Sequence, residues 1–248
     1  MQNKKIGLTV SVLCLIGLWQ LLAVLIGEEL ILPSPVRVVV KLGEMAGTSQ
    51  FYRTVGITFG RILAGFSIAV LLGSILSVLS VYSDAIQTLL FPVISVLKSI
   101  PVASFAVLCL MWVRTNNLPI LISCVVNIPI IYINSLSGMK SADVKLLQMA
   151  KVYRLKFFTR LRYIHLPAAK DQFLAAVSLS SGVAWKSAVA AEIIGLPAVA
   201  IGSAVQTAKV YLETAELFAW TVVVLALSAL FDKAVAKFFN LLFKVAVR

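Results

Sequence analysis

Four charged residues interrupt the long apolar stretches of this sequence: Arg61, Lys98, Lys186 and Glu192. A charge held in apolar surroundings is costly, so such residues often bind ions or solutes. Arg61 can extend its charge to the nearer end of its stretch, or it can pair with a carboxylate such as Glu192. If Lys98 and Lys186 face one cavity, they favour the binding of an anion. Packing, extension to the surface and pairing between helices are the alternatives.

Two uncharged residues, Asn127 and Trp185, are further candidates for the lining of a solute path, although hydrogen bonding and packing between helices would also explain them. His165 is the single histidine, and neither it nor the three cysteines show metal-ligand spacing. We find no convincing nucleophile–base pair and no G-x4-G-K-[ST] phosphate loop. These residues therefore predict binding without catalysis, with no metal and no cofactor held by this chain.

The composition indicates the medium in which these residues lie. Hydrophobic residues make up 60% of the 248 residues and charged residues 13%, with a mean hydropathy of +1.01. Soluble globular and disordered chains are far less apolar. The 22 basic and 10 acidic residues fall between apolar stretches and not on one solvated face, which argues against nucleic-acid binding. The chain is therefore predicted to be a membrane protein.

We predict an all-α polytopic bundle of six transmembrane helices, which forms a single domain over residues 1–248. The six stretches are 6–26, 55–80, 89–113, 118–137, 173–192 and 215–231. Period-2 alternation is too weak for a barrel. A short amphipathic helix is expected over 36–45, with Ser34 as its cap and Pro35 in its first turn.

Local sequence features predict how these helices bend and pack. Prolines are expected to kink the third helix at Pro92 and Pro101 and the fourth at Pro119 and Pro129. Two stripes of small residues at four-residue spacing predict close approach of another helix. The stripes are Gly56, Gly60 and Ala64 in the second helix, and Ala176, Ser180, Ala184 and Ala188 in the fifth.

The distribution of basic residues predicts the orientation. Two lie at the N-terminus (Lys4 and Lys5), eight in the segment 139–172, and four in the C-terminal tail (Lys233, Lys237, Lys244 and Arg248), whereas five lie on the opposite side. Cytoplasmic loops carry the excess of Lys and Arg. Both termini and the segment 139–172 are therefore expected in the cytoplasm.

The segment 139–172 has the pattern of two short amphipathic helices. One apolar edge comprises Leu146, Leu147 and Ala150, and the other comprises Phe157, Leu161 and Ile164. The polar side carries Arg154, Lys156, Arg160 and Arg162, and Pro167 is expected to end the second helix. Such a segment can dock into a groove of a partner protein, or it can lie on anionic lipid.

The same segment resembles the EAA loop of ABC importer permeases, whose pattern is E-A-A-x3-G-x9-I-x-L-P. Gln148, Met149 and Ala150 occupy the first three places, Arg154 the glycine place, and Ile164-x-Leu166-Pro167 the end. The spacing matches throughout, whereas Gln148, Met149 and Arg154 depart from the pattern. The residues that we expect in the coupling surface are Gln148, Met149, Ala150, Arg154, Phe157, Phe158, Leu161, Ile164, Leu166 and Pro167.

Further motifs make most of the chain similar to the nitrate/sulfonate/taurine-type permeases. They are Leu32-Pro33-Ser34-Pro35, Arg61-x3-Gly65-Phe66, Lys98-Ser-Ile-Pro101, and Ala184-Trp185 followed by Ala191-Glu192. The resemblance implies a type I ABC importer permease fold in a prokaryotic inner membrane. It also implies two ATPase subunits that bind ATP and magnesium, a second permease copy or paralogue, and an extracytoplasmic solute-binding protein. Alternating access would then be driven from the segment 139–172.

Two other functions remain compatible with the residues themselves: a stand-alone secondary transporter or channel, and a membrane scaffold without transport. The resembled family carries small organic or inorganic anions and thiamine-related pyrimidines. Its solute specificity rests largely with the binding protein, so the solute itself is not predicted.

Overall fold

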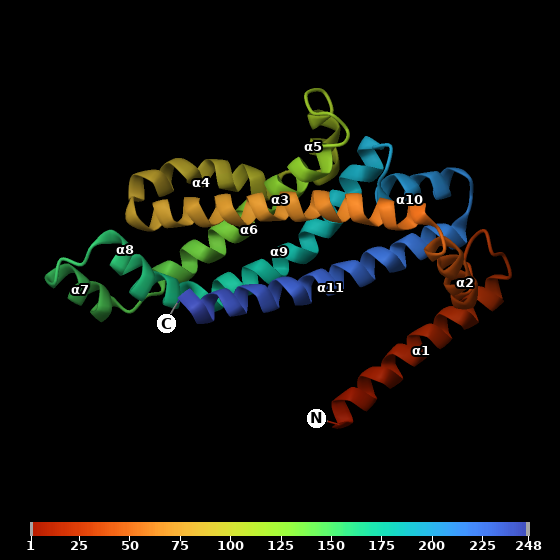
Figure 1. Cartoon of the computed structure of the whole chain (residues 1–248), viewed down its shortest axis with the longest axis horizontal. Helices are drawn as coiled ribbons and strands as arrows, with labels where there is room; N and C mark the ends of the chain where they lie inside the picture. Colours follow the sequence, from red (N-terminus) through yellow and green to blue (C-terminus); the bar gives the residue numbers. More distant parts are fainter. Residues whose placement is uncertain (1, 247–248) are drawn as a thin grey trace. The chain divides into compact units, whose positions relative to one another are not determined.

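The computed structural model describes residues 2–246, and Arg248 lies outside them, as do the side chains of Lys4 and Lys5. All regular elements of the described residues are helices. In chain order they are α1 (Gln2–Ile26), α2 (Pro35–Ala46), α3 (Ser49–Tyr82), α4 (Asp84–Ser99), α5 (Val102–Cys109), α6 (Leu118–Lys140), α7 (Val144–Val152), α8 (Phe157–Arg160), the π-helix η1 (Leu161–His165), α9 (Leu166–Gly195), α10 (Ile201–Val210) and α11 (Thr214–Ala246) (Figure 1).

Four helices in the described residues are long and apolar enough to cross a membrane: Ser49–Tyr82, Leu118–Lys140, Phe157–Gly195 and Thr214–Lys244. The α4–α5 pair makes a fifth if it counts as one broken span. The first predicted stretch falls on α1, whose part Leu13–Ile26 is apolar. The all-α membrane fold is confirmed, and the number six stays a prediction.

The third predicted helix bends at Pro101 as expected, but it does so by breaking into two helices and not as one kinked helix. It is divided into α4 and α5, which are bent by 101°. Ile100 between them is extended, with φ −67° and ψ 124°. Pro101 follows it, and a proline disfavours helical backbone in the residue before it. The break re-aims the chain, so that α5 packs against α6 and α9.

The other prolines behave differently from one another. Pro119 lies in the first turn of α6, where the missing N–H leaves no bond unmade, so the prediction that it kinks the helix was wrong. Pro92 and Pro129 lie inside α4 and α6, and the kinks expected there stay predictions. The short helix α2 is confirmed: Ser34 Oγ accepts from the N–H of Arg37, and Pro35 begins the helix.

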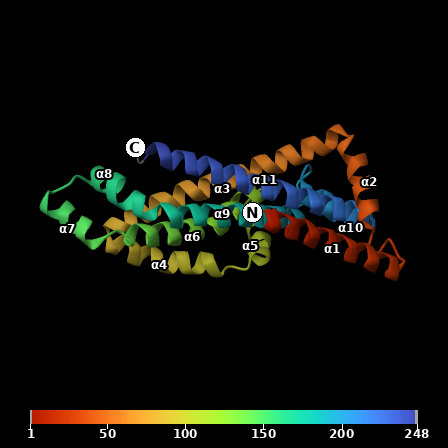
Figure 2. The ribbon, with the colours of Figure 1, turned by 90° about the horizontal axis from the view of Figure 1, so that it is seen from below.

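The chain divides into two compact units. One comprises Met1–Thr58 and Leu196–Leu225, and the other comprises Phe59–Gly195 and Ala226–Arg248. In the second unit α6 and α9 form the main helix pair, and α4 lies against α6. Figure 2 shows α7 and α8 beyond the ends of α6 and α9, in agreement with Figure 1. The larger unit therefore carries both the helix bundle and the segment 139–172.

Small residues bring α9 close to α6. The predicted stripe of Ala176, Ser180, Ala184 and Ala188 is buried throughout. At the other end of the pair, a Cβ added to Gly138 would lie 2.8 Å from Ala169 Cα, so only glycine fits there. The stripe in α3 is different, because a Cβ at Gly56 or Gly60 would meet nothing within 4 Å. These two glycines permit no close approach within the described residues.

Candidate functional site

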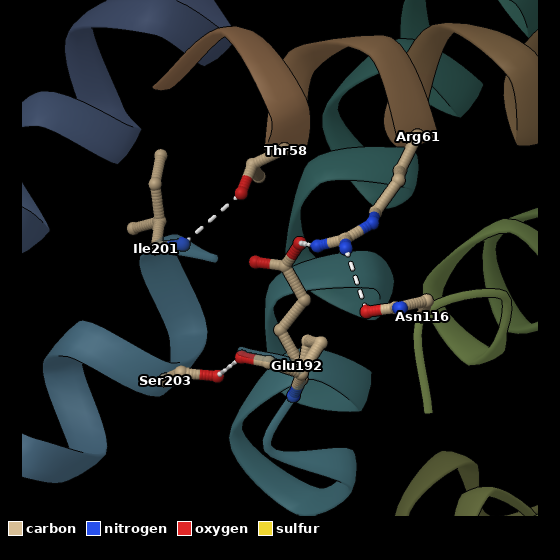
Figure 3. Close-up of polar contacts among 7 residues, drawn as sticks. Thr58, Arg61, Asn116, Glu192, Ile201 and Ser203 are labelled. Carbon is tan, nitrogen blue, oxygen red and sulfur yellow. Dashed lines mark hydrogen bonds and ion pairs between the residues drawn. The ribbon is translucent and has the colours of Figure 1, made fainter. Parts of the chain in front are cut away.

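Arg61 and Glu192 form an ion pair inside the second unit (Figure 3). Arg61 Nη1 lies 3.1 Å from Glu192 Oε1, and Arg61 Nη2 donates to Asn116 Oδ1 at 3.1 Å. The side chain of Glu192 is 0% exposed and that of Arg61 is 11% exposed. Of the two alternatives for Arg61, the structure shows the pair with the carboxylate. The pair joins the first half of α3 to the end of α9.

A second set of polar contacts holds the start of α10 in the other unit (Figure 3). The N–H of Ile201 donates to Thr58 Oγ1 at 3.0 Å, and Ser203 Oγ donates to the carbonyl of Pro197 at 2.7 Å. The first N–H groups of a helix lack partners within the helix. Ala200, at the cap position, supplies no side-chain bond, so Thr58 takes over this role from α3. α10 lies outside every helix predicted from the sequence.

Of the four predicted path residues, two lie in the packing between helices. Asn127 Nδ2 donates to the carbonyl of Ser123 at 2.6 Å, and Asn127 Oδ1 accepts from Ser180 Oγ at 2.7 Å. Trp185 is fully buried, with its ring near those of Phe59 and Phe231. In this conformation Asn127 and Trp185 join helices and do not line an open space.

The two lysines of the predicted path are exposed. Lys98 lines a cavity of about 330 Å³ between α4 and α6, together with Gln87, Ser95, Tyr132, Ser137 and Lys140, among others. Lys186 does not line this cavity; it lies on an exposed face of α9. A lysine deep in a membrane-spanning helix avoids lipid by facing protein or a water-filled cavity. Both lysines are therefore placed where a second molecule or water can reach them.

The segment 139–172 contains α7, the first of the two predicted short helices, and α8, where the second begins. Arg154 between them has φ +50°, the left-handed conformation in which glycine is normally found. The N–H of Leu155 donates to the carbonyl of Ala150 at 2.9 Å, and that of Arg154 to the carbonyl of Lys151 at 3.2 Å. These are the two bonds of a Schellman motif. The turn that glycine would favour is thus made with arginine.

Replacing Arg154 by glycine is expected to stabilise this turn. A left-handed conformation costs an L-residue about 1–2 kcal/mol, whereas glycine pays about 0.5–1 kcal/mol in backbone entropy. We expect a net gain of about 0.5–1 kcal/mol, seen as slower proteolysis of the segment. Arg154→Ala removes the same charge but keeps the strain. A gain of equal size in both variants would attribute the effect to charge.

The inner faces of the two short helices pack against each other. Ala142, Ala150 and Ile164 form a buried cluster, with Leu147, Leu155 and Ala168 packed around it. His165 is also buried, and its Nδ1 lies 3.0 Å from the carbonyl of Met139 at the end of α6. Since this cluster closes the inner side, only the opposite face of the segment can meet a partner.

The outer face of the segment is apolar and basic. The most exposed apolar side chains from Gln148 to Phe158 are those of Val152, Tyr153 and Phe158, and Met149 and Phe157 are about half as exposed. Gln148 is exposed too, as are the basic residues Lys151, Arg154 and Lys156. Phe157 and Phe158 differ: the ring of Phe157 packs on Tyr82 at 4.3 Å between centroids, whereas Phe158 is 79% exposed. We call this outer set, from Gln148 to Phe158, the docking face.

The end of the predicted pattern is built into the bundle. Leu161, Leu166 and Pro167 are half-buried, and Leu166 lines an apolar cavity of about 310 Å³ with residues of α3, α6, α9 and α11. Pro167 does not end the second helix, and this prediction was wrong. α8, η1 and α9 run on as one helix from Phe157 to Gly195. The N–H of Leu166 bonds to the carbonyl of Leu161, so a π turn precedes the proline.

Some polar contacts were not anticipated from the sequence. Asp232 on α11 accepts from Ser178 at 2.7 Å and from Ser181 at 2.9 Å on α9. In the other unit, Lys41 on α2 lies 3.2 Å from Glu216 and 3.6 Å from Glu213. Burial alone would lower the pKa of Lys41, but these two carboxylates outweigh it and raise the pKa. These contacts could not be predicted from the sequence, because isolated acidic residues at the ends of apolar stretches have no spacing that identifies their partners.

Comparisons with known proteins give the family. Residues 56–244 match the family described as binding-protein-dependent transport system inner membrane component. The putative aliphatic sulfonates transport permease protein SsuC of Bacillus subtilis is 26% identical, over 89% of this chain and 80% of its own length. The taurine transport system permease protein TauC of Escherichia coli is 25% identical, over 93% and 86%.

A third relative matches a shorter region. The formylaminopyrimidine transport permease protein ThiX of Halalkalibacterium halodurans is 27% identical over 42% of this chain and 41% of its own length. The matched family covers most of the chain, including α6, the docking face and α9. The chain therefore belongs to the inner-membrane permease components of binding-protein-dependent ABC transport systems.

Proposed function

We propose that this permease couples to two separate ATPase subunits through the segment 139–172 and moves its solute by alternating access. The observation that carries the proposal is the docking face, an exposed apolar and basic surface on two helices whose inner side is closed. Exposed aromatic residues are the usual anchors of protein interfaces. A groove on the ATPase would cover Tyr153 and Phe158, which are otherwise left in water.

The continuity of the helices supplies the mechanical link. Because α8 continues through η1 into α9, a displacement of α8 acts directly on a membrane-spanning helix. ATP and magnesium would be bound by the partner subunits, which supply the energy of the cycle. A second permease copy or paralogue and an extracytoplasmic solute-binding protein complete the proposed complex. In this arrangement both termini lie in the cytoplasm of a prokaryotic cell and the bundle is surrounded by membrane lipid.

Reconstitution into proteoliposomes tests the proposal. The permease is purified with and without its candidate ATPase subunits, and uptake of solute delivered by the binding protein is measured. We expect uptake only when the ATPase and ATP are present. Uptake by the permease alone, driven by an ion gradient, would contradict the proposal and identify a stand-alone secondary transporter or channel.

We further propose that the solute is a small organic or inorganic anion or a thiamine-like precursor. Lys98, which lines the cavity between α4 and α6, supports an anion, and the exposed Lys186 is the second candidate although it does not line that cavity. Sulfonates and taurine are named for two relatives, and formylaminopyrimidine for the third. Competition among these compounds for uptake by the reconstituted complex would identify the class.

Replacing either lysine by alanine is expected to lower the uptake of an anionic solute. A hydrogen bond to a charged group contributes about 1.5–3 kcal/mol, so Lys98→Ala and Lys186→Ala should each reduce uptake about tenfold or more. Lys209→Ala, which removes an exposed lysine of α10, is the matched control. Unchanged selectivity between anionic and neutral solutes in both variants would exclude these lysines from the path.

A further inference from the structure

Tyr82 occupies a corner of the second unit. It is the last residue of α3, and the next residue, Ser83, caps α4 by accepting from the N–H of Ile86. Tyr82 lies outside the segment 139–172. The side chain of Tyr82 therefore lies where α3 ends and α4 begins.

Three residues of α8 and of the π-helix η1 that follows it pack around the ring of Tyr82. The ring of Phe157 lies 4.3 Å away between centroids, and that of His165 lies 5.3 Å away at 77°, an edge-to-face contact. The guanidinium carbon of Arg160 is 4.4 Å from the centre of the Tyr82 ring. Ring pairs and a cation over a ring attract through the quadrupole of the ring.

Two further contacts fix this cluster. The hydroxyl of Tyr82 donates to the carbonyl of Phe157 at 3.4 Å. The Nε of Arg160 is buried and has no hydrogen-bond partner among the described residues. The guanidinium group packs on the ring of Tyr82. His165 also bonds to the carbonyl of Met139, which brings the end of α6 into the same cluster.

We propose that Tyr82 is a positioning residue that ties the coupling helix α8 to the α3–α4 corner. α8 is already continuous with α9, so the ring of Tyr82 adds a second connection, from α8 to α3. A displacement delivered at the docking face then moves α3 and α9 together. Without the ring, α9 moves while α3 lags behind. The inference rests on the proposed function, since it concerns the path of the motion and not its source.

Tyr82→Ala and Tyr82→Phe in the reconstituted complex test the proposal. Tyr82→Ala is expected to leave ATPase binding intact but to raise the ATP consumed per solute transported at least about fivefold. Tyr82→Phe keeps the ring contacts and should restore nearly normal coupling. Tyr211→Ala, at an exposed tyrosine outside this cluster, is the control. Normal coupling in Tyr82→Ala would overturn the inference and leave the proposed function standing.

If Tyr82→Ala fails to fold, a cross-link still tests whether this contact moves as one body during transport or only supports the fold. Cysteines replace Tyr82 and Phe157 in a chain whose three native cysteines are removed, and a short bifunctional thiol reagent joins them. If the corner and α8 move together, the joined complex still transports. Loss of transport after cross-linking, regained when a cleavable cross-link is cut, would show that the contact opens during the cycle. That result would overturn the inference. A wild-type complex that neither binds the ATPase nor uses ATP would instead refute the proposed function.

Discussion

Replacing Phe158 by aspartate is expected to abolish binding of the ATPase subunits while the membrane bundle stays folded. The side chain is 79% exposed, so the permease itself loses little when it is removed. In the complex, the variant would bury a carboxylate where an aromatic anchor had been. Removal of such an anchor costs about 2–4 kcal/mol, or roughly 30- to 1,000-fold in affinity, and the uncompensated charge adds to this.

The measurement is copurification of the ATPase with tagged permease from detergent-solubilised membranes. Phe158→Trp, which keeps an aromatic anchor, should retain the partner. Phe157→Asp is less informative, although its spacing suggested it equally, because the Phe157 ring packs on Tyr82 and its loss would disturb the corner as well. Full recovery of the ATPase with Phe158→Asp would mean that the docking face binds something else, such as anionic lipid.

The contrast between Phe157 and Phe158 shows what could and could not be predicted from the sequence. Spacing located the segment and put Arg154 in the place of the pattern's glycine, and the structure shows at Arg154 a φ of +50°, which glycine favours. The predicted edge of Phe157, Leu161 and Ile164 already separated Phe157 from Phe158. Spacing could not name the residue on which the Phe157 ring packs, because that residue, Tyr82, lies far away in the sequence.

For the helices, too, the sequence predicts the positions but not the geometry. Long apolar stretches located the spans, since lipid requires every backbone group to be paired within a helix. Prolines marked the weak points without giving the outcome: Pro101 accompanies a bend of 101°, whereas Pro119 begins α6. The difference lies in where each proline falls relative to the first turn, which depends on tertiary packing. α10 was missed because its start is capped by Thr58 from a distant helix.

The ion pair between Arg61 and Glu192 leads to the other large predicted effect. Arg61→Ala or Glu192→Ala alone would break the ion pair at the fully buried carboxylate of Glu192, and the loss of one member of a buried pair typically costs about 3–5 kcal/mol. For a chain of this size, that loss corresponds to a fall in Tm of roughly 6–20 °C. Arg53→Ala, at an exposed arginine of the same helix, should change Tm little. Thermal unfolding of the purified permease in detergent gives the comparison.

The double variant Arg61→Met/Glu192→Leu separates the pair from its surroundings. A buried ion pair replaced by apolar residues of similar volume is often as stable as the original. We therefore expect this variant to recover most of the Tm that each single variant loses. Asn116, which accepts from Arg61, loses its donor in the double variant and limits the recovery. If the single variants were as stable as the wild type, the charges would have to be hydrated in the native protein, and the pair would not hold α3 to the end of α9.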